Sequence, residues 1–133
     1  QPARYIAPLF PFTTKTAPAG KARFSLAYGS CPKVQEDSIQ PIWNAVDDLH
    51  TDLFFWVGDN IYGDSLDPGI LAEEYRRQRD VAALQPVIRR VPQLAVWDDH
   101  DFALNDHDRT NPVKDKALEV FKRYWANPGY GLT

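Results

Sequence analysis

The sequence predicts an α/β fold in which a parallel β-sheet is built from a strand-helix-strand-helix-strand-helix unit. Two uninterrupted apolar runs of strand length, residues 53–57 and 94–97, are separated by a stretch with helical periodicity. A third run, residues 23–28, alternates apolar and polar side chains and comes before the first helical stretch. Because strands that alternate with helices along a chain usually pair in parallel, we expect three parallel strands.

Helical stretches are expected after each strand. The second helical stretch starts at Pro68, and residues 82–90 form a further short helix that ends before Pro92. The last helix follows Pro112 and carries an apolar face up to Trp125. The first stretch follows Ser38, and we expect its apolar stripe to cover the sheet with Ile39, Ile42, Trp43, Val46 and Leu49.

Length and composition indicate one small domain. The chain has 133 residues, of which 44% are hydrophobic, and its proline-rich residues 1–22 are expected to form an extended arm before the domain at 23–133. A net charge of −3 does not favour a nucleic-acid partner. The sequence contains no run of about 18 apolar residues that would predict a membrane span. Cys31 is the only cysteine and cannot form an internal disulfide.

Carboxylates follow two of the predicted strands directly. Gly58 allows a tight turn after the second strand, which directs Asp59 outward, and Asp98, Asp99 and Asp101 follow the third strand. Carboxyl ends of parallel strands meet at one edge of a sheet, so these oxygen ligands should lie together. We interpret this edge as a metal site, with Asp59 as the ligand that bridges two cations.

Other residues are placed to complete such a site. Cys31 follows the first strand, where a bound cation would hold it as a thiolate. Tyr62 could add a phenolate oxygen, a hard donor for a trivalent or small divalent ion. Asp99 would bind the second metal, with His100 beside the substrate.

Each residue also has a simpler interpretation. Gly58 and Asp59 are ordinary turn residues, Cys31 suits a buried thiol, and Tyr62 suits a packing position. An EF-hand loop is excluded, because from Asp99 its sixth and twelfth places hold Leu104 and Thr110. A haloacid-dehalogenase motif on Asp99 and Asp101 would need an early strand and a following Thr or Val, whereas Phe102 follows here.

Three motifs together resemble the alkaline phosphatase D family of calcineurin-like metallophosphoesterases. They are Gly29-Ser-Cys31, Gly58-Asp-Asn-Ile-Tyr-Gly-Asp64 and Trp97-Asp-Asp-His-Asp-Phe102. The resemblance runs from about residue 23 to the end of the chain and implies the amino-terminal half of an αββα sandwich. It also implies export to the periplasm or secretion.

The resemblance assigns roles to single residues. Asp59 and Tyr62 match the family's bridging aspartate and tyrosinate, Cys31 its thiolate ligand, and Asp99 a further metal-ligand position. His100 matches the position that contacts phosphate and acts in catalysis. The implied cofactor is a dinuclear or multinuclear site of Fe³⁺ with Ca²⁺ or another divalent cation.

The implied reaction is hydrolysis of a small-molecule phosphate mono- or diester by a metal-bound hydroxide. Asn60 and Arg76 are the expected substrate-binding residues, Arg76 because a guanidinium pairs with phosphate oxygens.

The chain departs from the family in its histidines. It has only His50, His100 and His107, and none lies in the Gly-His-x-His element that supplies further ligands. We therefore expect about half of a dinuclear site. The competing hypothesis is a non-catalytic α/β fragment that binds a metal, the C-terminal half or another copy of itself.

Overall fold

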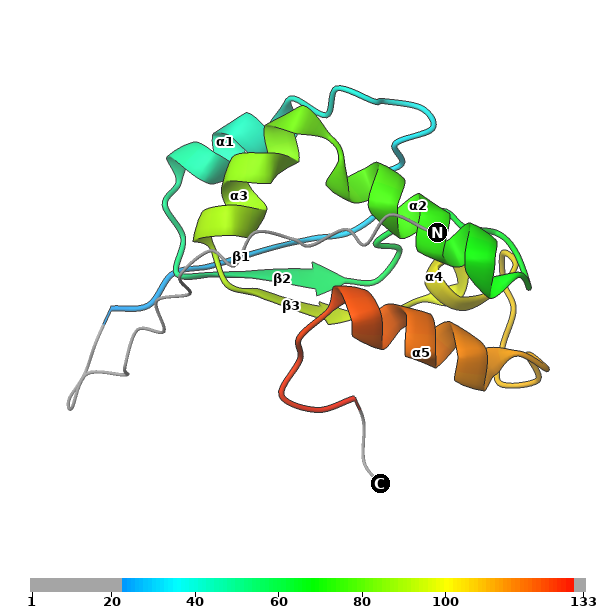
Figure 1. Ribbon diagram of the computed structural model, residues 1–133. Helices are drawn as coiled ribbons and strands as arrows, with labels where there is room; N and C mark the ends of the chain where they lie inside the picture. The colour runs from blue at the N-terminus through cyan, green and yellow to red at the C-terminus, as the bar shows by residue number, and fades with distance from the viewer. Residues whose placement is uncertain (1–22, 131–133) are drawn as a thin grey trace, which may run out of the picture.

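A computed structural model describes residues 23–130 (Figure 1). Its centre is a parallel three-stranded sheet in the order β1-β2-β3, made of β1 (Leu26–Gly29), β2 (Leu53–Val57) and β3 (Gln93–Val96). The predicted α/β class is confirmed at this level. The expected arm, residues 1–22, lies outside the described residues.

Five α-helices and one 3-10 turn connect and follow the strands. They are α1 (Ile42–Asp48), α2 (Pro68–Arg79), η1 (Ala82–Leu84), α3 (Gln85–Arg90), α4 (Asp99–Phe102) and α5 (Lys114–Tyr124). Helix α2 begins where expected, with Pro68 in its first turn and the Asp67 carboxylate accepting a hydrogen bond from the Gly69 amide at 2.7 Å. Helix α4 was not predicted, because four residues are too few to show a helical period.

One face of the sheet carries the hydrophobic core. Phe54 and Trp56 of β2 point to this face. The ring centroids of Trp43 and Trp125 lie 5.0 and 5.2 Å from the ring centroid of Trp56. These aromatic contacts join α1 and the end of α5 to the central strand. Helices α2 and α3 contribute to the same core with Leu71 and Val87.

The predicted apolar stripe of the first helix is wrong in part. Helix α1 begins only after Pro41, so Ile39 precedes it and is 72% exposed, and Ile42 and Leu49 are 62% and 67% exposed. Trp43 instead fills the space over β2, where its indole N–H donates to Gln40 Oε1 at 2.6 Å. Of the predicted stripe, Trp43 and the partly buried Val46 are therefore the residues that pack against the core.

The opposite face of the sheet is open in the described part of the chain. Side chains alternate along strands, and those that point away from the core are apolar: Leu26, Tyr28, Val57 and Val96 are 49%, 73%, 40% and 46% exposed. The helices that share the core with Phe54, Trp56 and Ala95 leave this face uncovered. None of the helices described has the length and apolar character that crossing a bilayer requires.

Candidate metal centre

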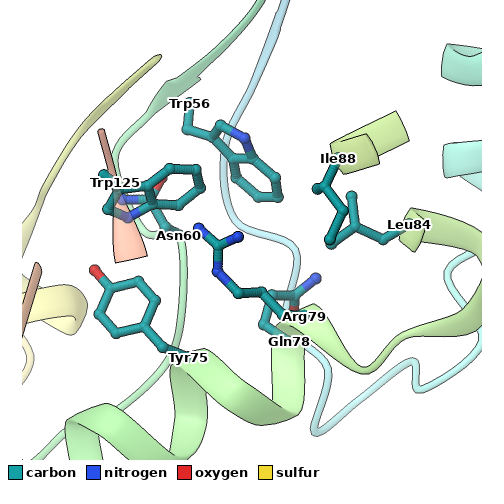
Figure 2. A pocket seen from close by; sticks show the side chains of 8 residues that line it. All are labelled: Trp56, Asn60, Tyr75, Gln78, Arg79, Leu84, Ile88 and Trp125. Carbon is teal, nitrogen blue, oxygen red and sulfur yellow. The ribbon is translucent and has the colours of Figure 1, made fainter. Parts of the chain in front are cut away.

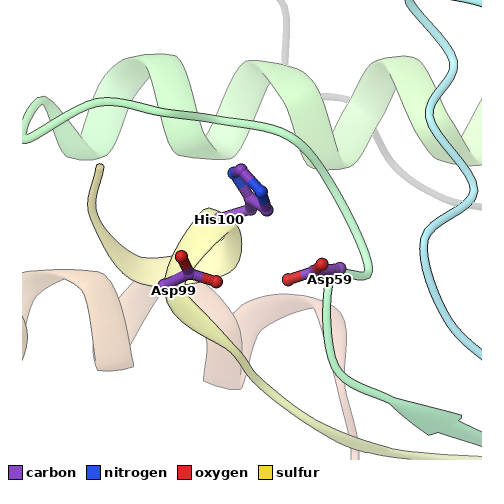
Figure 3. Close-up of side chains that lie close together, drawn as sticks. All are labelled: Asp59, Asp99 and His100. Carbon is purple, nitrogen blue, oxygen red and sulfur yellow. The ribbon is translucent and has the colours of Figure 1, made fainter. Parts of the chain in front are cut away.

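The candidate centre lies at the carboxyl ends of β2 and β3. Asp59 comes two residues after β2, while Asp99 and His100 begin α4 just after β3. One ligand atom from each of these three residues lies within 4.8 Å of the other two. Figure 3 shows the two carboxylates facing each other across the gap between the two loops, with the imidazole beside them. The structure brings together three residues that the sequence assigned to one site.

The loop after β2 owes its shape to left-handed backbone conformations. Gly58 has a φ of 98°, and a Cβ there would lie 2.9 Å from the Cβ of Asp98. Glycine therefore lets the β2 loop approach the β3 loop closely. Asp59 itself has a φ of 47° and Cys31 one of 60°, a conformation that residues with a Cβ adopt at a cost. Two of the six described non-glycine residues with a positive φ are therefore predicted ligands.

Cys31 and Tyr62 join the same edge. The Cys31 Sγ lies 3.4 Å from Asp59 Oδ2 and donates to it. Burial raises the pKa of the Tyr62 hydroxyl, and the nearby Cys31 thiol and Asp59 carboxylate raise it further. The Tyr62 ring also packs against His100, with 4.3 Å between ring centroids. All the predicted metal ligands and the predicted catalytic histidine thus gather at one edge.

The donor set fits a cation. The Oδ1 atom of Asp59 is buried, and no described residue donates a hydrogen bond to it. Burial also raises the pKa of Asp59, and the neighbouring Asp99 and Asp98 charges act in the same direction. A cation between the Asp59 and Asp99 carboxylates would satisfy the unpartnered oxygen and offset this repulsion. Carboxylate, phenolate and thiolate donors are all groups that bind transition metals.

His100 is held by a residue that sequence reasoning did not single out. Its Nδ1 lies 2.6 Å from Asp64 Oδ1, and Asp64 also has a positive φ of 43°. Burial lowers the pKa of His100, but the hydrogen bond and charge of Asp64 outweigh burial, so the net shift is upward. Asp64 fixes the orientation of the ring through Nδ1, and Nε2 is the ring nitrogen that this contact does not use. The sequence feature that could have identified Asp64 is its place as the second aspartate of the Gly58–Asp64 motif.

The two predicted substrate-binding residues lie elsewhere. The Asn60 side chain is buried, and its Nδ2 donates to the Val96 carbonyl at 2.8 Å and to Asp101 Oδ2 at 3.1 Å. Arg76 is exposed on α2, in a shallow hollow that it shares with Glu73 and Asp80. The side-chain donor bonds of Asn60 thus go to the end of β3 and to Asp101, and Arg76 shares its hollow with other residues of α2 and its C-cap.

Asp101, from the same Trp97–Phe102 motif as Asp99, lies beneath this edge of the sheet. Asp101 is fully buried, and its carboxylate accepts five hydrogen bonds from neighbouring residues. Burial raises its pKa to about 7, while the hydrogen bonds from Asp98, Asn60 and Tyr75 favour the ionised form. Together with Asp98 it forms a capping box on α4. The three-residue spacing of these aspartates was the sequence signal, but it does not distinguish a buried carboxylate from a ligand.

A small pocket lined by core residues is separate from this centre. Figure 2 shows the Arg79 guanidinium below Trp56, with Trp125 on one side of it and Leu84 and Ile88 on the other. Burial lowers the pKa of Arg79, whose guanidinium carbon lies 4.6 Å from the centre of the Trp125 ring. None of the predicted metal ligands lines this pocket. It belongs to the packing of α2 against the core.

Comparison with known proteins adds no relative to this picture. No family model matches the chain, and neither a curated protein nor a solved structure matches it. The case for a function therefore depends on the residues and the geometry described above.

Proposed function

We propose that this chain carries part of a metal-dependent phosphoester hydrolase, as its resemblance to the alkaline phosphatase D family implies. The observation that supports this most directly is the meeting of Asp59, Asp99 and His100 within 4.8 Å, from the ends of two neighbouring strands. Cys31 and Tyr62 at the same edge match the thiolate and phenolate that the resemblance implies. In this proposal the described sheet is one half of an αββα sandwich.

Four residues would hold the metals. Asp59 lies close to both Cys31 and Asp99 and would bridge two cations. As the resemblance implies, Cys31 and Tyr62 would bind one of them and Asp99 the other. Bound cations of this kind supply Lewis acidity, lowering the pKa of a water and neutralising phosphoryl oxygens. The choice of Fe³⁺ with Ca²⁺ or another divalent cation rests on the resemblance.

His100 is the group in this site that can move a proton. Asp64 holds its Nδ1, which leaves Nε2 to face a substrate phosphate or a leaving-group oxygen. Positioned acid–base groups contribute about 10²–10⁴-fold to a rate. Tyr62 packs against the ring and restricts its rotation.

Ferric iron gives a direct test, because a tyrosinate bound to Fe³⁺ absorbs visible light by charge transfer. We expect the purified chain to develop this band when Fe³⁺ is added, and Tyr62→Phe to abolish it while preserving the packing on His100. Asp59→Asn should weaken iron binding itself. Asp108→Asn is the matched control, since Asp108 is an exposed aspartate of the neighbouring segment whose side chain accepts hydrogen bonds only from Thr110 among described residues.

The outcome also bears on activity. Hydrolysis of bis(4-nitrophenyl) phosphate by the loaded chain, lost in Asp59→Asn and retained in Asp108→Asn, would support a working site. A chain that stays colourless with iron and binds no divalent metal would overturn the proposal. In that case the resemblance would concern the fold alone.

The competing proposal, a non-catalytic α/β unit that pairs with another half or another copy, is favoured by the open face of the sheet. Tyr28, Val57 and Val96 lie exposed there, and exposed apolar faces mark interaction surfaces. Mass measurement in solution tests self-association. Replacing Tyr28 and Val57 by Ser should convert a dimer to a monomer, whereas a wild-type chain that is already monomeric contradicts self-pairing.

A further inference from the structure

We infer that Asp101 is a positioning residue, which fixes the distance between the β2 loop that carries Asp59 and the β3 loop that carries Asp99. The inference rests on the proposed function, because it concerns the geometry of the same site. In this inference Asp101 acts through the metal ligands Asp59 and Asp99, whose positions it fixes, and does not itself contact the metals.

The bonds of Asp101 connect the two loops directly. From the β2 loop, the Asn60 amide and Asn60 Nδ2 both donate to Oδ2 at 3.1 Å, and the Ile61 amide donates to Oδ1 at 3.2 Å. From its own loop, the Asp98 amide donates to Oδ2 at 3.0 Å. Each partner is a direct neighbour, or the next residue but one, of a candidate ligand. Asp101 therefore acts on the backbone that carries Asp59 and Asp99.

Asn60 strengthens the same connection from the other side. Its Nδ2 donates to the Val96 carbonyl at 2.8 Å as well as to Asp101, so a side chain of the β2 loop holds the end of β3. The Gly63 amide also donates to the His100 carbonyl at 3.1 Å. A ligand set taken from two loops keeps its geometry only while those loops keep their separation.

The Tyr75 hydroxyl offers a way to distinguish an effect on ligand positions from an effect on stability alone. It donates to Asp101 Oδ1 at 2.9 Å from α2, which carries none of the candidate ligands. Tyr75→Phe therefore removes a buried hydrogen bond but keeps the carboxylate and its bonds to both loops. Asp101→Asn acts on the loops themselves. Whichever way its amide is turned, the NH₂ group must face either the Asn60 and Asp98 donors or the Ile61 and Tyr75 donors.

The experiment compares Co²⁺ binding by the wild-type chain, Asp101→Asn and Tyr75→Phe, using the visible d–d bands of bound cobalt, with Asp108→Asn as control. We expect Asp101→Asn to weaken Co²⁺ binding by about 10–100-fold, the usual effect of losing a group that orients metal ligands. Tyr75→Phe should lower the melting temperature yet change the affinity by less than about threefold. Asp108→Asn should match the wild type.

Amide hydrogen exchange provides a readout without metal. In Asp101→Asn the amides of Asn60, Ile61 and Asp98 should exchange faster, while those of β2 keep their protection. Faster exchange throughout the chain, or equal loss of cobalt affinity in Asp101→Asn and Tyr75→Phe, would overturn the inference.

Two further outcomes are distinguishable. A wild-type chain that binds no cobalt overturns the proposed function and the metal role of Asp101 with it, and the exchange experiment then decides alone whether Asp101 holds the loops together. If Asp101→Asn does not fold, Asn60→Ala takes its place, because it removes the side-chain bonds to Asp101 and Val96. Asn60→Ala should then weaken cobalt binding about tenfold, and unchanged binding would contradict the inference.

Discussion

Asp99 and Asp101 lie two residues apart on α4 but in opposite surroundings. Asp101 is fully buried and accepts five hydrogen bonds from the chain. Asp99 lies at the edge, where the Asp106 amide donates to it and where it faces Asp59, whose Oδ1 has no described partner. The chain satisfies one carboxylate completely and leaves acceptor capacity at the other. This difference separates a structural group from a candidate ligand.

The contrast extends to the neighbouring residues. Around Asp101 the partners are backbone amides and the buried Asn60 and Tyr75, which rigidify the joint between the loops. Around Asp99 the neighbours are other titratable groups, Asp59 and His100, whose ligand atoms lie within 4.8 Å of one another. Close ionisable groups are common where a protein binds a ligand or does chemistry.

The largest expected effect is on stability, from Asp101→Ala. Removing the carboxylate leaves its buried donors without an acceptor, and each such group costs about 1–3 kcal/mol. We expect the free energy of unfolding to fall by at least about 3 kcal/mol, measured by urea denaturation in EDTA. Asp99→Ala is the matched variant and should change it by only about 1 kcal/mol, because it removes one hydrogen bond, from the Asp106 amide. Equal losses in both variants would erase the distinction between the two aspartates.

Sequence reasoning recovered the parts of this picture that depend on chain order. Apolar runs and helical periods predicted the parallel strands, and the ends of those strands placed Asp59 and Asp99 at one edge. It did not distinguish Asp99 from Asp101, because both follow the same strand and burial depends on the tertiary partners Asn60 and Tyr75.

The same limit explains the other differences. Asn60 follows Asp59 directly and was expected at the substrate, but its side chain turns inward to Val96 and Asp101. Asp64 was not singled out, because its contact with His100 joins residues 36 positions apart. The apolar residues around α1 were expected against the sheet, but of these only Trp43 and Val46 pack against the core, and Ile39, Ile42 and Leu49 are exposed.

A smaller effect is expected from adding metal. A ligand that binds only the folded chain, at 100 times its dissociation constant, stabilises it by about 2.7 kcal/mol. Mn²⁺ should therefore raise the melting temperature of the wild type, and EDTA should reverse the shift. The shift should be lost in Asp59→Asn and kept in Asp108→Asn. An equal shift in Asp59→Asn would mean that Mn²⁺ binds at a different place from the Asp59 and Asp99 edge.

The smallest effect concerns the pH dependence of the His100 and Asp64 pair. The folded chain raises the pKa of His100 above its ordinary value of 6.5, so protonation of the imidazole favours folding. This stabilisation is fully present below pH 6.5 and is lost as the pH rises through the pKa of the folded state. Because the Asp64 side chain is 45% exposed, its contribution should be only about 0.2–1 kcal/mol.

Asp64→Asn tests this pair without removing the hydrogen bond, since the amide oxygen can still accept from Nδ1–H. In EDTA, the wild type should exceed Asp64→Asn in the free energy of unfolding at pH 5.5, and the difference should vanish by pH 8.5. An NMR titration of the His100 ring should show a lower pKa in Asp64→Asn. A stability difference that is the same at both pH values would show that Asp64 acts on the shape of its loop, where it has a φ of 43°, and not through its charge on His100.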